Sequence, residues 1–230
     1  MNYIIFDGDG TLWDSSRGTI LFMEYLFAKY LPDIPFTKGA KKGYEITREE
    51  MSVYENQWYG SELDFFFHRS IQNYLPSVNA VELKHRIIAR LFQSFQKKYE
   101  YPLAEQIITE MENSWAAFYS LFPGMYEILG ECKKKEIPCV LLTNGFELLQ
   151  RKKIKQTKLE FFFDKIIISE EVGISKPDLD IFKKAMGEGQ GIMIGDSLEH
   201  DILPAKELGL ETFHFQGEDS VEDVGALLHG

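Results

Sequence analysis

The sequence contains five short apolar runs, and each is followed directly by a polar residue. The runs are Tyr3–Phe6, Pro138–Thr143, Lys165–Ser169, Gly191–Gly195 and Glu211–Phe215. Continuous rather than alternating apolar character is typical of strands that are covered on both faces, as in a parallel sheet. Helical patterns lie between the last four runs, at Phe146–Lys158, Leu179–Ala185 and Ile202–Leu208. This alternation predicts an α/β fold with a Rossmann-like, doubly wound parallel sheet.

Residues 7–137 separate the first apolar run from the second, and most of them carry helical patterns. Thr47-Arg48-Glu49-Glu50 and Asn79-Ala80-Val81-Glu82 have the form of a capping box, so we expect helices that begin at Thr47 and Asn79. An amphipathic helix is predicted by the spacing of Leu103, Ile107, Ile108, Met111, Trp115, Phe118 and Tyr119. We therefore expect a helical cap domain at residues 15–118 and a core domain at residues 1–14 and 119–230.

The composition limits the partners of the chain. Its formal net charge is −11 over 230 residues, which is unsuited to a nucleic acid polymer or an anionic membrane surface. An anionic substrate must therefore meet a local cation. The two cysteines, Cys132 and Cys139, form no disulfide framework, and no apolar run approaches the roughly 18 residues of a membrane span. We expect a reduced, cytoplasmic protein, as a monomer or weak homodimer.

Four polar motifs follow these runs or lie in the loops between them. They are Asp7-Gly8-Asp9-Gly10-Thr11, Thr143-Asn144-Gly145, Lys176-Pro177, and Gly195-Asp196-Ser197 with Asp201 five positions beyond Asp196. In an open α/β sheet, ligands bind outside the carboxyl ends of the strands. We therefore expect all four motifs to converge on one edge of the sheet.

The residue types in these motifs suit phosphoryl chemistry. Asp7, Asp9 and Asp196 offer the hard oxygen ligands that Mg²⁺ prefers. Lys176 supplies a fixed positive charge and Thr143 a hydroxyl donor, while a carboxylate can attack phosphorus. We assign the attack to Asp7. Asp9, two residues further on, is placed to give a proton to the leaving oxygen and then to activate water.

Each motif taken alone has a simpler interpretation. Asp-Gly-Asp-Gly is often a surface turn, and it also occurs in calcium loops, although the further acidic ligands of an EF-hand are absent here. Thr143-Asn144-Gly145 alone favours a turn, and Gly195-Asp196-Ser197 alone could cap a helix. The order of the four motifs at strand ends is what makes the set specific.

This set resembles the motifs of the haloacid dehalogenase-like (HAD) hydrolase superfamily. The resemblance covers residues 1–14 and 120–215, and the helical insertion between them is similar to the C1 cap of that superfamily. It implies that Asp7 is the nucleophile and a Mg²⁺ ligand, and that Asp9 is the acid/base and binds the metal through its backbone carbonyl. It further implies that Asp196 is a metal ligand and that Asp201 supports the water shell of the metal.

The resemblance also implies a phosphate site and a reaction. Thr143 and Lys176 would hold the phosphoryl oxygens, with the backbone N–H of Asn144. Dehalogenases of the superfamily lack the second aspartate of the first motif, so Asp9 indicates a phosphatase of small phosphomonoesters, such as nucleoside monophosphates or sugar and glycolate phosphates. A phosphoglucomutase-like phosphotransferase and a non-catalytic phosphate-binding protein are the alternatives. Thr143-Asn144-Gly145-Phe146 and Ser169-Glu170-Glu171-Val172-Gly173 resemble a subgroup of cytoplasmic nucleoside 5′-monophosphate phosphatases.

The insertion itself carries less specific signals. Trp13, Trp58, Trp115 and Phe65-Phe66-Phe67 could form an aromatic floor for a base, but aromatic residues at helical spacing are more often core, which we favour. Lys41, Lys42 and Arg48 could contact substrate or lie in solvent.

Overall fold

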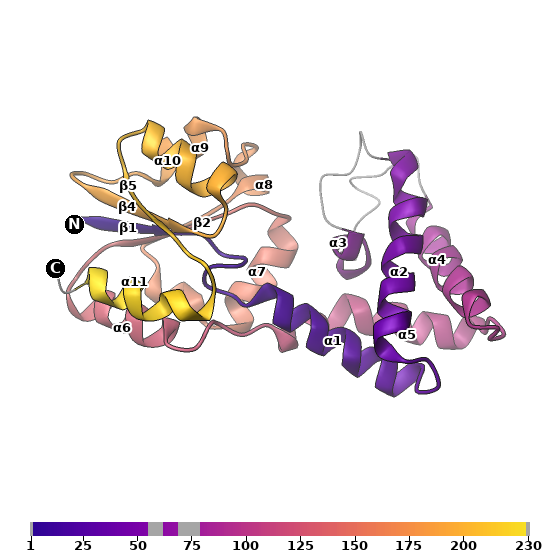
Figure 1. Cartoon of the computed structure of the whole chain (residues 1–230). Coiled ribbons are helices and arrows are strands. Elements are labelled where there is room, and N and C mark those ends of the chain that lie inside the picture. Colours follow the sequence, from indigo (N-terminus) through magenta and orange to yellow (C-terminus); the bar gives the residue numbers. More distant parts are fainter. Residues whose placement is uncertain (1, 55–61, 69–78, 229–230) are drawn as a thin grey trace. The chain divides into compact units, whose positions relative to one another are not determined.

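The structure is a computed structural model that describes residues 2–54, 62–68 and 79–228. A five-stranded sheet forms its α/β part, with every neighbouring pair of strands parallel and the order β3-β2-β1-β4-β5 (Figure 1). The strands are β1 (Tyr3–Phe6), β2 (Cys139–Thr143), β3 (Lys165–Ile168), β4 (Gly191–Gly195) and β5 (Glu211–His214). The predicted fold class is confirmed, and each strand end lies within one residue of its prediction.

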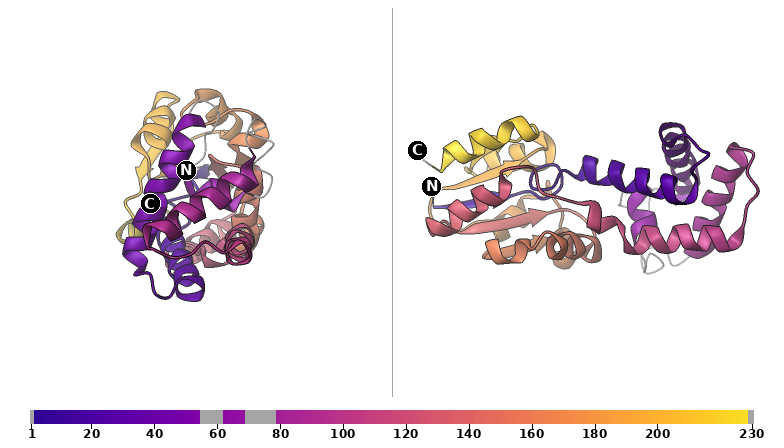
Figure 2. Two further views of the ribbon diagram at one scale, coloured as in Figure 1. Left: turned by 90° about the vertical axis from the view of Figure 1, so that its right-hand side faces the viewer. Right: turned by 90° about the horizontal axis from the view of Figure 1, so that it is seen from below.

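Helices cover both faces of the sheet. One face is covered by α6 (Met125–Lys134), α7 (Glu147–Gln156) and α11 (Val221–Leu227), which bury the side chains of Ile4 and Phe6. The other face packs against α9 (Leu179–Ala185) and α10 (Leu203–Glu207), which bury Tyr3 and Ile5. The right-hand view of Figure 2 looks at the sheet from the side of α6 and α11. Burial on both faces explains why the strands are apolar without alternation.

The central position of β1 brings the polar motifs together. Phe6 pairs with Leu141 of β2 and with Ile194 of β4. The three strands are parallel and in register, so they end at nearly the same level. The backbone N–H of Asp7 extends the pairing by donating to the carbonyl of Ile194 at 2.9 Å. Residues that follow β1, β2 and β4 therefore meet at one edge of the sheet.

The chain divides into two compact units, one of Met1–Arg17 with Tyr119–Gly230 and one of Gly18–Phe118. The second unit is helical and follows β1, as the C1-cap expectation requires. Its helices are α1 (Ser15–Tyr30), whose first turn lies in the other unit, α2 (Phe36–Met51), α3 (Glu62–Phe67), α4 (Ala80–Ser94) and α5 (Tyr101–Asn113). Our division at residues 14 and 119 stays a proposal for where the domains separate.

Two of the helix predictions in this unit are wrong. Thr47 does not begin a helix: α2 begins at Phe36, and the buried Thr47 hydroxyl donates to the carbonyl of Gly43 at 2.8 Å. A local capping pattern carries no information about a helix that is already under way. The amphipathic helix expected to reach Tyr119 stops at Asn113, with a short 3-10 helix after Ser114. The prediction at Asn79 is confirmed, since its side chain accepts from the backbone N–H of Glu82 at 3.1 Å.

Of the aromatic residues that could have formed a floor for a base, those whose side chains the structure describes are buried, as we favoured. In the helical unit Phe67 stacks on Trp115, with ring centroids 5.0 Å apart. Trp13, however, belongs to the α/β unit, where it is fully buried and its Nε1 donates to Thr157 Oγ1 at 3.0 Å. Grouping Trp13 with the cap aromatics was therefore wrong. Trp58 and the side chain of Phe65 lie outside the described residues.

An apolar cavity of about 350 Å³ lies among α1, α2, α4 and α5. Gly43 of α2 faces it: a Cβ built on this residue has Leu91 Cδ1 as its nearest neighbour, at 4.0 Å. Gly39, one turn earlier, is packed tightly, and a Cβ there would overlap the ring of Phe27.

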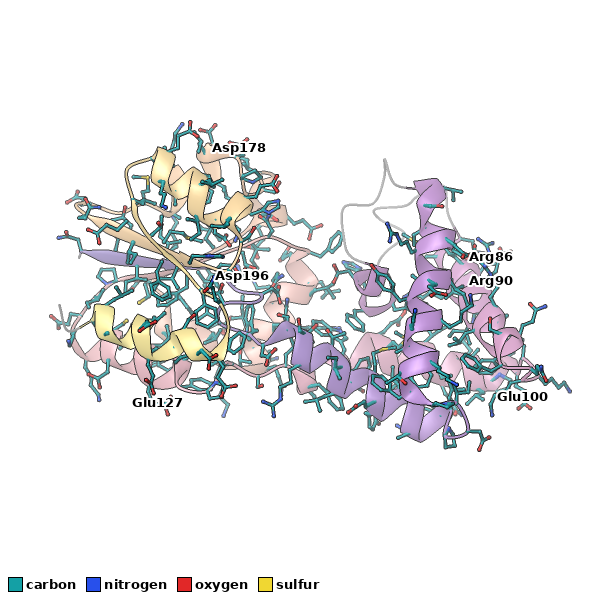
Figure 3. The ribbon with its side chains drawn as sticks, viewed as in Figure 1. Arg86, Arg90, Glu100, Glu127, Asp178 and Asp196 are labelled. Atoms are coloured by element: carbon teal, nitrogen blue, oxygen red, sulfur yellow. The ribbon has the colours of Figure 1, made fainter. Side chains whose placement is uncertain are left out.

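On the surface, Glu50 of α2 pairs with Arg86 and Arg90 of α4, at 2.8 and 2.7 Å; Figure 3 labels the two arginines. Among the described residues, no helix combines the length and the hydropathy needed to cross a membrane.

Candidate active site

The site is assembled from four segments at the carboxyl ends of the strands. Asp7 follows β1, Thr143 ends β2, and Lys176 lies in the loop between α8 (Ser169–Val172) and α9. Asp196 follows β4, where Figure 3 labels it, and Asp201 lies in the helical turn Leu198–Ile202. The predicted convergence of the four motifs is therefore seen in the structure.

A buried ion cluster forms the centre of the site. Lys176 Nζ lies 2.5 Å from Asp7 Oδ1 and 2.6 Å from Asp201 Oδ1, and all three side chains are buried. Burial opposes the charge of Lys176, but the two carboxylates outweigh it and raise the pKa of this lysine above its usual value. Burial raises the pKa of Asp7 to about 7, against the lowering effect of Lys176 and with a further rise from the charges of Asp201 and Asp196. The cluster thus holds more negative than positive charge in a poorly solvated place.

The arrangement of carboxylates fits a divalent cation. Asp7, Asp196 and Asp201 each place a carboxylate oxygen so that all three atoms lie within 4.8 Å of one another. Asp7 Oδ2 is buried and has no hydrogen-bond partner among the described residues. A buried carboxylate oxygen without a partner is costly, so this oxygen is expected to meet a ligand, either a cation or a reacting group. We expected Asp201 to act through the metal's water shell, and its carboxylate in fact lies in the same cluster as Asp7.

Asp9 lies outside that cluster and has partners of its own. Its Oδ1 accepts a hydrogen bond from the hydroxyl of Ser15, while its Oδ2 accepts from Gln150 Nε2 at 2.9 Å and forms an ion pair with Lys153. Burial alone would raise the pKa of Asp9, but the charge and hydrogen bond of Lys153, together with the bonds from Ser15 and Gln150, hold it below its usual value.

Asn144 has a structural role beyond the backbone contact expected of it. Its side-chain Nδ2 donates to the carbonyl of Lys176, and its Oδ1 accepts from the N–H of Lys176, both at 2.9 Å. This pair of bonds ties the end of β2 to the loop that carries Lys176. Thr143, buried beside it, has its hydroxyl close to the backbone of Gly8.

Gly10 shows why the first motif needs glycine. Its φ of 86° lies in the left-handed region, and a Cβ there would overlap the carboxylate of Asp196. A side chain at Gly10 would therefore displace the carboxylate of Asp196 as well as strain the backbone.

Sequence reasoning missed Ser15, Gln150 and Lys153. One signal was available for the last two: they are polar residues three apart on a helix, next to the buried Leu149 and Ile154. Residues at i and i+3 share a helix face, so this pair was placed to point inward with the apolar residues.

Comparison with known proteins places the chain in a family. A family model described as haloacid dehalogenase-like hydrolase matches residues 1–209. The chain belongs to this family. This HAD-like hydrolase is 27% identical to the pyrimidine 5′-nucleotidase YjjG of Escherichia coli strain K12 over 223 residues, which cover 92% of this chain and 84% of YjjG. It is 33% identical to the glyceraldehyde 3-phosphate phosphatase of Methanocaldococcus jannaschii over 120 residues, 50% of this chain and 53% of the relative.

Solved structures show the same fold. The HAD-hydrolase YfnB from Bacillus subtilis, solved with bound magnesium, superimposes with a TM-score of 0.61 at 18% identity and covers 100% of both chains. A HAD phosphatase from Thermococcus onnurineus gives a TM-score of 0.52 at 20% identity, over 94% of this chain and 86% of that one. At sequence identities of 18% and 20%, these two structures support the fold of this hydrolase and nothing more.

Proposed function

We propose that this HAD-family phosphatase hydrolyses small phosphomonoesters with the help of Mg²⁺, through a phosphoaspartate formed on Asp7. The observation that carries the proposal is the buried cluster in which Lys176 holds Asp7 Oδ1 while Asp7 Oδ2 has no described partner. One oxygen of the nucleophile is fixed and the other is available to attack.

In the first step Asp7 Oδ2 forms a bond to phosphorus and the bond from phosphorus to the ester oxygen breaks. Asp9 gives a proton to the departing oxygen, so that a neutral alcohol leaves. Because Lys153 holds the pKa of Asp9 below its usual value, Asp9 takes up this proton only when the negative charge of the bound phosphate raises that pKa. Lys176, the hydroxyl of Thr143 and the backbone N–H of Asn144 would hold the phosphoryl oxygens. Fixed donors of this kind stabilise developing charge without having to reorganise.

In the second step water attacks the phosphorus of the phosphoaspartate and the bond to Asp7 Oδ2 breaks. Asp9, now a carboxylate, accepts the proton of the attacking water, so one group serves as acid and then as base. Asp7, Asp196 and Asp201 are the residues that would hold Mg²⁺, with the backbone carbonyl of Asp9. Bound there, the cation would neutralise phosphoryl oxygens and relieve the repulsion between the carboxylates.

We further propose nucleoside monophosphates as the first substrates to test and sugar phosphates as the second. Support comes from the pyrimidine 5′-nucleotidase of Escherichia coli, which aligns with 92% of this chain, and from two glyceraldehyde 3-phosphate phosphatases, which align with 50% and 41% of it. A phosphotransferase would use the same first step and differ in passing the phosphoryl group to a hydroxyl. Product analysis separates the two reactions.

The decisive experiment measures phosphate release from 4-nitrophenyl phosphate and a panel of nucleoside and sugar monophosphates, with Mg²⁺ and with EDTA. Asp7→Asn should lower turnover by about 10³-fold or more, since a residue that acts as the nucleophile is rarely replaceable. Asp223→Asn, on the exposed face of α11, is the matched control and should retain activity. A folded wild-type protein that releases no phosphate with Mg²⁺, or an Asp7→Asn variant with appreciable turnover, would contradict the proposal.

A further inference from the structure

A second buried lysine belongs to the site without contacting the ion cluster around Asp7. Lys153 of α7 is 6% exposed, and its Nζ forms an ion pair with Oδ2 of Asp9. We propose that Lys153, together with Gln150, is a positioning residue for the reaction: the two hold Oδ2 of Asp9, so that Oδ1 is the oxygen that exchanges the proton with the leaving group. This inference rests on the proposed phosphatase function.

The hydrogen bonds of Asp9 determine which oxygen is free. A carboxylate has about four acceptor positions, two on each oxygen. Oδ2 accepts from both Gln150 Nε2 and Lys153 Nζ, which fills its two positions. Oδ1 accepts from the Ser15 hydroxyl among the described residues, which leaves one position open. The Asp9 side chain is 36% exposed, so a ligand can approach it.

The surroundings of Lys153 keep its ammonium group in place. Nζ lies 5.1 Å from the centroid of the Trp13 ring and 5.5 Å from that of Tyr119, within the range of cation–π attraction. Trp13 is itself fixed by its bond to Thr157 Oγ1, which in turn donates to the carbonyl of Lys153 at 2.7 Å. A lysine that lies close to two aromatic rings is ordered before substrate binds, as a positioning residue must be.

Gln150 connects the ion pair of Lys153 and Asp9 to the residues that we propose hold the phosphate. Its Nε2 donates to Asp9 Oδ2 and to the carbonyl of Asn144, both at 2.9 Å. The side chain of Asn144 then holds the backbone of Lys176. One continuous set of hydrogen bonds therefore sets the proton-transferring aspartate relative to the lysine that holds the nucleophile.

If Lys153 acts through Asp9, the loss of kcat/KM in a Lys153 variant should depend on the leaving group of the ester. The ratio kcat/KM reports the steps up to the cleavage of the ester bond. Nitrophenolate leaves readily without a proton, whereas an alkoxide does not, so misplacement of Asp9 should affect poor leaving groups more. General acid catalysis contributes about 10²–10⁴-fold. We expect Lys153→Met to lower kcat/KM by about 10–10²-fold for benzyl and phenyl phosphate, and by a much smaller factor for 4-nitrophenyl phosphate.

The experiment compares kcat/KM for these three esters in the full chain with Mg²⁺. The variants are Lys153→Met, Lys153→Arg, which should restore most of the activity, and Lys155→Met, a control at an exposed position of the same helix. Gln150→Leu removes the second donor to Oδ2 and should show the same selective loss. It provides the test if Lys153→Met does not fold, as judged by circular dichroism and thermal melting.

A double-mutant cycle separates this role from a structural one. If Lys153 acts through Asp9, adding Lys153→Met to Asp9→Asn should lower kcat/KM little further, because the group it positions is already gone. Equal losses on all three esters, or a full additional loss in the Asp9→Asn background, would overturn the inference. Failure of the phosphatase proposal is a different result, since the wild-type protein would then release no phosphate from any ester.

Discussion

Replacing Lys176 with methionine tests the electrostatics of the site most directly. The substitution keeps an unbranched side chain of similar length and removes the ammonium that lies 2.5 Å from Asp7 and 2.6 Å from Asp201. The side chains of all three residues are at most 7% exposed, so water cannot replace the lost charge. Two carboxylates are then left facing each other in a buried place.

The expected size of the effect follows from this burial. Removing one partner of a buried ion pair typically destabilises a protein by about 3–5 kcal/mol. For a protein of this size such a loss lowers the melting temperature by about 6–20 °C. Mg²⁺ should recover part of the loss, because a cation between Asp7, Asp196 and Asp201 supplies the missing positive charge. Without the competing ammonium, the variant should bind Mg²⁺ at least about 10-fold more tightly than the wild-type protein does.

The assay is urea and thermal unfolding of both proteins in EDTA and over a series of Mg²⁺ concentrations. Mg²⁺ should raise the stability of Lys176→Met by more than that of the wild-type protein. Lys183→Met, which removes an exposed lysine of α9, is the control and should behave like the wild-type protein. A Lys176→Met variant that is as stable as the wild type in EDTA, or that gains no more from Mg²⁺, would refute the reasoning.

Three further outcomes follow from the structure. Gly43→Ala should stabilise the helical unit by about 0.5–1 kcal/mol in thermal melts, because helix interiors disfavour glycine and the new Cβ meets nothing closer than Leu91 Cδ1, at 4.0 Å. Gly39→Ala should destabilise the unit by about 1–3 kcal/mol through overpacking, and equal effects of the two substitutions would contradict this. The pKa of Glu110 is lowered to about 2, chiefly by its hydrogen bond to Lys29, so the stability that Glu110 contributes is complete above its unfolded pKa of 4.5 and is lost as the pH falls toward 2. The stability of Glu110→Gln should therefore fall less than that of the wild-type protein over this pH range in acid unfolding, and identical pH profiles of the two proteins would refute the assignment. Asp196→Asn should raise the Mg²⁺ concentration for half-maximal activity by about 10-fold or more without lowering the stability in EDTA, and an unchanged Mg²⁺ titration would rule out a role in binding the metal.

The strands and the main site residues were predictable because both depend on local sequence. A four-residue apolar run such as Tyr3–Phe6 can be satisfied by a strand covered on both faces, and the polar residue after it must then lie at the sheet edge. That is why Asp7 and Asp196, far apart in the chain, could be placed together without coordinates.

The parts that were not predictable depend on how helices are oriented. Whether Lys153 contacts Asp9 is set by the rotation of α7 against the sheet. The sequence pattern indicates the inward face of the helix, but it does not indicate which residue Lys153 meets there. The error at Thr47 has a related cause, since a capping pattern is short and cannot detect that α2 began at Phe36. Trp13 was grouped with the aromatic residues of the cap, whereas its contact with Thr157 connects positions 144 residues apart in the α/β unit.

The place of β1 in the middle of the sheet has a consequence for synthesis on the ribosome. Ile5 pairs with Val140 and with Met193, so the first strand emerges long before either neighbour. At about 5–20 residues per second, the stretch from Ile5 to Val140 takes roughly 7–27 s to translate.

During that interval the helical unit, which is continuous from Gly18 to Phe118, can complete its own contacts while Tyr3–Phe6 stays unpaired. That run is shorter than the five to seven residues typical of aggregation-prone segments, and Asp7-Gly8-Asp9 interrupts it with charge. The carboxylates that we assign to the chemistry of the finished enzyme therefore also act as gatekeepers for the nascent chain.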